Sequence, residues 1–139
     1  MQDMHNNVLI KKVIAPVVVS DNTAAVGTVI DRAGFDSLEF IILTGTLADS
    51  DATFTVLVEH ADANFSGEAA VADAQLLGTE AEASFQFDDD GEVRKIGYRG
   101  GKRYVRLTIT PANNTGSSPI AVCAVLGHPI VAPVTQSAS

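Results

Sequence analysis

The chain has 139 residues, of which 46% are hydrophobic, and a formal net charge of −8. This length fits one domain with one core, and the hydrophobic fraction excludes a disordered chain. The negative charge argues against a general nucleic-acid binder, which needs a basic surface. The only cysteine, Cys123, excludes an intrachain disulfide, and its apolar neighbours predict a buried thiol.

The first half of the chain is a series of predicted strands. Residues 8–19 are rich in β-branched side chains and contain Pro16, which suits an edge strand or a bend between two strands. Residues 25–30 form a short predicted strand, and the apolar run 38–47 favours a buried one. Residues 53–60 alternate with period two, so that Phe54, Val56 and Val58 share one face.

The second half continues in the same way after a long acidic loop at residues 61–83, where only 68–77 could form a short helix or strand. Phe85 and Phe87 alternate, and an acidic turn follows at residues 88–91. Residues 93–98 and 103–110 form two predicted strands, and the two glycines between them favour a tight hairpin turn. A last apolar strand at residues 120–126 precedes an extended tail.

These elements predict an all-β fold, because about eight strands follow one another without a βαβ rhythm. We expect a two-sheet antiparallel β-sandwich, jelly-roll-like in topology. The expected single domain spans residues 1–139, with an N-terminal arm at about 1–19 and a C-terminal tail at about 128–139. Its predicted core contains Phe40, Ile42, Phe54, Val56, Val58, Val105, Leu107 and Ile109.

Charge is distributed unevenly along the chain. Residues 94–106 carry six of the nine basic residues, whereas residues 49–92 carry twelve of the seventeen acids. Such a bipolar protein suits ordered docking onto a charged partner or onto its own copies. The candidate contact residues in the basic segment are Arg94, Arg99, Lys102, Arg103 and Arg106, of which the turn residues should reach furthest.

The apolar N-terminal arm is a second candidate contact. Val8, Ile10 and Val13 could add to a neighbouring sheet by strand addition, and the tail at residues 129–134 could do the same. The alternative is that the arm is simply the first strand of the sandwich. An unpaired edge in this arm would need cover from a second copy or another protein, and a two-fold pair is the simplest closed solution.

No catalytic or metal-binding pattern competes with this interpretation. The three histidines lack partners at zinc spacing, and the aspartates at 88–90 do not alternate as calcium ligands do. No Gly-x-Ser-x-Gly motif is present. We therefore expect a protein that is not an enzyme and has no catalytic residues, no metal and no cofactor.

Nucleic acid and membrane are also not expected as partners. Tyr98 and Tyr104 could stack on bases beside the cations, but the overall negative charge opposes this. No apolar run approaches the ~20 residues that span a bilayer. The order of charged and apolar residues at the N-terminus is not that of a signal peptide, which predicts a product made in the cytoplasm.

Three stretches, residues 21–62, 94–111 (RKIGYRGGKRYVRLTITP) and 124–129 (AVLGHP), carry a resemblance to a known family. The chain resembles the head decoration, or cement, proteins of tailed bacteriophages, such as that of a Bordetella-infecting podophage. The resemblance covers residues 8–129. It implies a jelly-roll-like sandwich that binds the outside of an assembled capsid and stabilises joints between major capsid subunits as a homodimer.

The resemblance thus implies the major capsid protein and a second copy as partners, and the capsid exterior as location. Two other functions remain open from the residues. One is a head-completion or tail protein that forms rings of six or twelve copies. The other is a carbohydrate-binding β-sandwich displayed on a virion, which should expose an aromatic patch.

Overall fold

The computed structural model describes residues 2–138 and consists mostly of β-strands. The long strands are β1 (Leu9–Val19), β4 (Phe35–Thr44), β5 (Thr53–Ala61), β9 (Val93–Tyr98), β10 (Tyr104–Ala112) and β11 (Ser118–Pro129). The two-residue strands are β2 (Ala25–Val26), β3 (Ile30–Asp31), β6 (Ala69–Ala70), β7 (Leu76–Leu77) and β8 (Phe85–Gln86). The helical turns are η1 (His5–Asn7), η2 (Asp73–Gln75) and α1 (Glu80–Ala83), so the α-helical turn lies beyond the expected window at 68–77.

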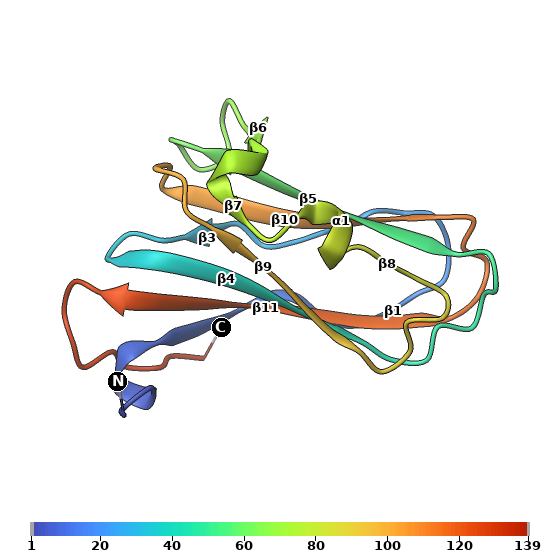
Figure 1. Cartoon of the computed structure of the whole chain (residues 1–139), viewed down its shortest axis with the longest axis horizontal. Coiled ribbons are helices and arrows are strands. Elements are labelled where there is room, and N and C mark those ends of the chain that lie inside the picture. The colour runs from blue at the N-terminus through green and yellow to red at the C-terminus, as the bar shows by residue number, and fades with distance from the viewer. Residues whose placement is uncertain (1, 139) are drawn as a thin grey trace.

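The strands form two antiparallel sheets that face each other (Figure 1). One has the order β1-β11-β4-β9-β7; in the other, β10 and β5 are flanked by β2 and β3 on one side and by β6 and β8 on the other. If each flanking pair counts as one position and the two-residue β7 is left aside, two rows of four result, β1-β11-β4-β9 opposite β2/β3-β10-β5-β6/β8. This arrangement has the two-sheet pattern of a jelly roll, and it confirms the expected all-β sandwich.

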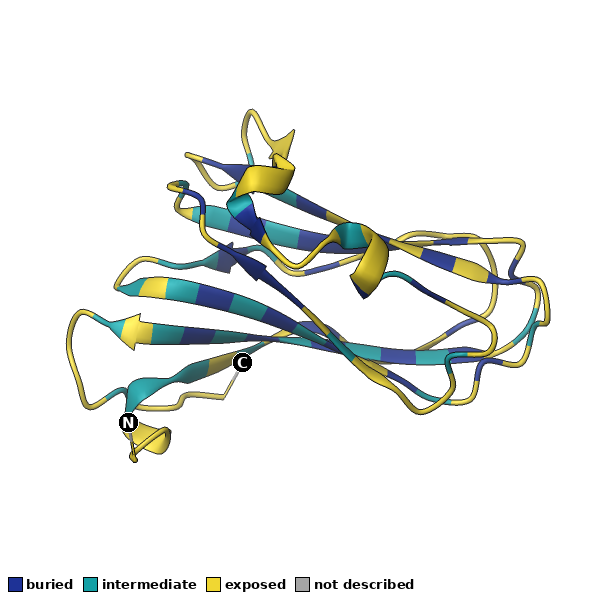
Figure 2. Ribbon diagram, in the orientation of Figure 1, coloured by how far each residue is buried: buried dark blue, intermediate teal, exposed yellow. Residues whose placement is uncertain are grey.

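The core lies between the sheets, where period-two side chains from both meet (Figure 2). All eight residues of the predicted core are confirmed, since each has at most 2% of its surface exposed. Phe54 stacks on Phe85, with ring centroids 4.8 Å apart. Alternation in β4, β5 and β10 therefore identified the inward faces correctly.

Strand β1 belongs to the sandwich, as in the second of the two alternatives for the N-terminal arm. It pairs with β11 from Leu9 to Val19, with register shifts on both sides of Ile14. Val13 is 2% exposed and lies in the core, so its expected role as a contact residue was wrong; beside the register shift its side chain points inward. The outer edge of β1 is partly covered by the chain's own tail, because the Gln136 side chain hydrogen-bonds both the N–H and the carbonyl of Ile10, at 2.9 and 2.8 Å.

The predicted hairpin between β9 and β10 is wrong. Strand β9 pairs with β4 and β10 pairs with β5, so residues 99–103 cross from one sheet to the other. The loop wraps around the Tyr98 ring, and a Cβ at Gly100 would lie 2.4 Å from the tyrosine hydroxyl. The glycine is therefore needed for close approach to a side chain. Arg32 closes the loop by donating to the carbonyls of Lys102 and Gly100, at 2.6 and 2.8 Å.

The hydroxyl of Tyr98 links this loop to the opposite sheet. It accepts a hydrogen bond from the backbone N–H of Lys102, at 3.0 Å, and lies 2.8 Å from Nδ1 of His60 on β5. Both side chains are buried. Because the hydroxyl already accepts from Lys102, its own proton can be donated to Nδ1 of a neutral His60 that carries its proton on Nε2.

Truncation of Phe54 tests the core. We expect Phe54→Ala to lower the free energy of unfolding by about 3–5 kcal/mol, because it leaves a cavity against Phe85. Phe87→Ala is the matched control, since that ring is 39% exposed. Urea denaturation measures both. Equal losses in the two variants would contradict the assignment of Phe54 to the core.

Removal of the Tyr98 hydroxyl tests the crossover. Tyr98→Phe leaves His60 Nδ1 and the Lys102 N–H without their partner, and we expect a loss of about 1–3 kcal/mol in unfolding free energy. Tyr104→Phe is the control, because Tyr104 is only half-buried and stacks beside Arg103. A Tyr98 variant as stable as the wild type would show that the hydroxyl does not hold the loop.

The buried imidazole should make stability depend on pH. Burial, and then the nearby Lys102, lower the pKa of His60 below its usual value. In the unfolded chain the group titrates near 6.5, so the unfolded state binds the proton more readily and stability falls as pH drops through about 6.5. The difference in unfolding free energy between the wild type and His60→Asn should therefore shrink from pH 7.5 to 5.5. A difference that stays constant would contradict this linkage.

Candidate docking surface

The basic segment is largely neutralised within the chain itself. Four of the five basic candidate residues form ion pairs at 2.7 to 3.0 Å. Arg94 pairs with Asp89 and Glu92, Lys102 with Asp62, Arg103 with Asp31, and Arg106 with Glu59. The expected bipolar surface is therefore not formed by these side chains, because the acidic and basic segments fold against each other.

The geometry of these pairs shows that they fix local structure. Arg103 donates two parallel hydrogen bonds to Asp31, both at 2.8 Å, and they hold the pKa of Asp31 below its usual value. Arg106 lies over the Phe65 ring, 4.5 Å from its centroid. Arg99 differs, because its side chain is exposed and takes part in no ion pair among residues 2–138. Of the basic candidates, Arg99 is the one that remains available for an external partner.

The outer face of the sheet β1-β11-β4-β9-β7, called face A below, is broadly apolar. Directly paired residues of antiparallel strands share a face, so the register defines which side chains point outward. They are Ile10, Lys12 and Val18 on β1, Pro119, Ala121, Cys123 and Val125 on β11, Ser37, Glu39, Ile41 and Leu43 on β4, Val93 and Lys95 on β9, and Leu77 on β7. Ile10, Val18, Leu43, Leu77 and Val93 are each between 45% and 64% exposed.

The outer face of the other sheet, called face B, is polar by comparison. Its outward side chains on β5 are Thr53, Thr55, Leu57 and Glu59, and those on β10 are Tyr104, Arg106, Thr108 and Thr110. Threonines and an ion pair are what a solvated sheet face normally carries. The two faces of one molecule therefore differ in kind, and face A is the one that resembles a surface to be covered.

Cys123 corrects the expectation of a buried thiol and shows why the sequence did not indicate face A. The thiol is only half-buried and lies on face A, because Val122 and Ala124 take the inward positions of β11. Burial raises the pKa of this thiol. The run around it is apolar on both faces of the strand, so the sequence could not indicate which of the two alternating sets of side chains faces the core. Continuous apolar runs are typical of strands covered on both faces, and this signal could have identified face A.

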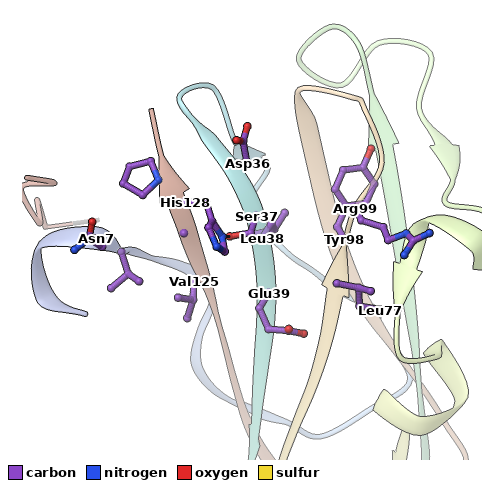
Figure 3. A pocket seen from close by; sticks show the side chains of 13 residues that line it. Asn7, Asp36, Ser37, Leu38, Glu39, Leu77, Tyr98, Arg99, Val125 and His128 are labelled. Carbon is purple, nitrogen blue, oxygen red and sulfur yellow. Dashed lines mark hydrogen bonds between the residues drawn. The ribbon is translucent and has the colours of Figure 1, made fainter. Parts of the chain in front are cut away.

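Face A is hollowed at several places, of which two contain candidate contact residues of the arm. A groove of about 600 Å³ crosses β11, β4 and β9, with Val125 and Asn7 on one side and Leu77 and Arg99 on the other (Figure 3). A second hollow, of about 320 Å³, lies over Ala121 between larger neighbours. Of the candidate contact residues in the N-terminal arm, Val8 lines the groove and Ile10 lies beside the second hollow.

Glu39 is the central charge of face A. It lies on β4, the middle strand, between Val125 of β11 and Gly97 of β9. A Cβ at Gly97 would lie 3.1 and 3.2 Å from its two carboxylate oxygens, so the carboxylate rests over the glycine backbone. Burial raises the pKa of Glu39, and Lys95 partly opposes this. Within residues 2–138 this carboxylate accepts no hydrogen bond that would stabilise its charge.

The groove contains one pair of side chains that could suggest chemistry. Ser37 Oγ lies 2.9 Å from Nδ1 of His128. A nucleophilic serine needs its histidine oriented by a third group, and no carboxylate of the described chain hydrogen-bonds His128. Residues 2–138 also contain no group of three or more potential metal ligands. In the same part of the chain, no helix is long and apolar enough to cross a membrane.

Comparison with known proteins identifies the fold. No protein-family model matches the chain, and no curated protein matches it in sequence. Among solved structures, the PBSX exported protein XepA superimposes with a TM-score of 0.57 at 12% identity, over 94% of this chain and 40% of that one. The chain thus spans 40% of the length of that protein.

Two further structures are less similar. The CBM36-1 domain of a multidomain xylanase from the hindgut metagenome of Trinervitermes trinervoides has a TM-score of 0.42 at 10% identity, over 90% of this chain and all of that domain. A protein of the Bacillus endospore appendages has a TM-score of 0.41 at 12% identity, over 91% and 96% of the two chains. At 12% identity the similarity to XepA shows a shared fold and no more.

Proposed function

We propose that the chain is a structural virion protein, a head decoration protein that binds the outer surface of an assembled phage capsid. In this role it stabilises joints between major capsid subunits and acts as a homodimer. The observation that carries the proposal is face A, a broad apolar sheet face on which Ile10, Val18, Leu43, Leu77 and Val93 remain exposed. A protein that works in an assembly needs such a surface and needs no active site.

The chemistry of the strands supports this function. The middle strands β4 and β11 have apolar side chains on both faces, as strands do when both of their faces are packed. Contiguous exposed apolar surface is typical of interaction sites. The resemblance to phage cement proteins and the fold similarity to an exported protein of the phage-related PBSX agree with a virion protein.

A carbohydrate-binding function finds less support in the positions of the aromatic rings. Sugar sites usually offer exposed aromatic platforms, whereas here Arg106 lies over Phe65 and Arg103 lies over Tyr104. Phe87, 39% exposed, stands alone as the large exposed ring among residues 2–138. Binding on a glycan array would favour the sugar alternative, and a stoichiometry of six or twelve would favour the ring-forming one.

The decisive experiment places a charge on each face. Leu43→Glu puts a carboxylate on face A, and Leu57→Glu, the matched control, puts one on face B; both leucines are exposed, at 46% and 37%. Assembled phage capsid particles are incubated with each variant and then sedimented. We expect Leu43→Glu to lower occupancy at least about tenfold, because a buried unpaired carboxylate opposes association, and Leu57→Glu to bind as the wild type does.

This outcome does not depend on which molecule covers face A in the particle. If a second copy covers face A, Leu43→Glu prevents dimerisation. The monomer then binds the capsid through one contact instead of two, and its apparent affinity falls. Circular dichroism and thermal melting verify that both variants remain folded. Full occupancy by folded Leu43→Glu would overturn the role of face A, and failure of the wild type to bind particles would overturn the decoration function.

A further inference from the structure

We infer that face A is the contact surface between two copies of this chain, related by a two-fold axis that passes between Glu39 and Lys95. The inference deepens the proposed function, on which it rests, by naming the molecule that covers face A. It follows from the charges of this face, because a flat apolar sheet surface by itself does not select its occupant.

The first step is that the charge of Glu39 must stay close to a cation when face A is covered. Its carboxylate is half-buried at the middle of face A and receives no hydrogen bond from residues 2–138. A purely apolar cover would remove its remaining water and leave a buried, unpaired charge, which is strongly unfavourable. Lys95 of the same chain offsets part of this cost, and a docking molecule that brings a second cation to this position offsets more of it.

The second step is that the chain itself carries a cation, Lys95, where a two-fold axis would place it over Glu39 of a second copy. Lys95 points outward from β9 and is paired with Ile41, two residues along β4 from Glu39. The two opposite charges are therefore diagonal neighbours on adjacent strands. A two-fold axis between them places Lys95 of each copy over Glu39 of the other, so that four alternating charges meet at the centre of the contact.

The third step concerns the surroundings of these charges. Leu43 and Val93 form the row next to Lys95, and Val125 and Leu77 lie in the row of Glu39 itself, on its two sides. In face-to-face packing these side chains would surround the charge cluster and exclude water from it.

The size of the face also suits a pair. Five strands at about 4.8 Å spacing and a ten-residue strand at about 3.4 Å per residue give at most about 800 Å². This equals the area that each partner contributes to an interface of standard size. Face B, whose Glu59 and Arg106 already pair with each other, has no comparable charge left for a partner.

A reciprocal charge swap tests the inference. Glu39→Lys and Lys95→Glu are prepared singly and together, and Thr55→Lys on face B is the matched control. Sedimentation equilibrium measures the dimer Kd. We expect each single variant to raise the Kd about tenfold or more, because like charges then face each other, and the double variant to return within about threefold of the wild type. Thr55→Lys should leave the Kd unchanged.

Rescue by the double variant is expected only if both partners are copies of this chain, because both surfaces then carry the swapped charges. A capsid protein that contacts Glu39 and Lys95 keeps its own charges, so the double variant would present two reversed charges to it and bind more weakly than either single variant. A wild type that stays monomeric at a concentration on the order of 100 μM, or a double variant as weak as the singles, would overturn the inference. If the swap behaves as expected but neither protein binds capsid particles, the decoration function fails and the pairing stands. If a strictly monomeric wild type binds capsid particles, the pairing fails and the decoration function stands.

Discussion

Each strand of a β-sandwich can turn only every second side chain into the core, and this alternation organises the molecule. Phe40 and Ile42 of β4 meet Phe54 and Val56 of β5 between the sheets, and the residues between them are left outside. On β5 the left-over residues are mainly threonines, which water solvates well. On β11 they are apolar, and on β4 they include Ile41 and Leu43 besides Ser37 and Glu39. The rule that closes the core of one chain therefore leaves a second apolar surface open on one side of the sandwich.

Electrostatics in this protein serves mainly to close the chain on itself. The acidic and basic segments are adjacent in the fold because β5 pairs with β10, which brings Glu59 opposite Arg106. Further pairs lock the crossover at residues 99–103, where Tyr98 already joins the loop to His60 on the other sheet. Three charges outside these ion pairs bear on contacts with other molecules. Arg99 stands at the end of the sandwich, and Glu39 and Lys95 lie on the apolar face.

The failure of the predicted hairpin has a clear physical cause. Two glycines between two strands are a local signal, and locally they suit a tight turn. A jelly roll, however, sends several consecutive strands to opposite sheets, as β9 and β10 are here. Gly100 is present because the loop backbone passes close to the Tyr98 ring, which is a contact created by the fold. The same tertiary arrangement turned Val13 inward and Cys123 outward, although both stand in apolar runs.

The sequence by itself determined the class of fold, the positions of the long strands and the inward faces of β4, β5 and β10, because alternation is written into neighbouring residues. It also determined that two strands are apolar on both faces. Only the tertiary structure decided which strands pair, which acids neutralise which bases, and that Leu43, Val93 and Glu39 share one uncovered surface. These are relations between residues far apart in the chain. They depend on register and on sheet order, and neither is recorded in the local spacing of side chains.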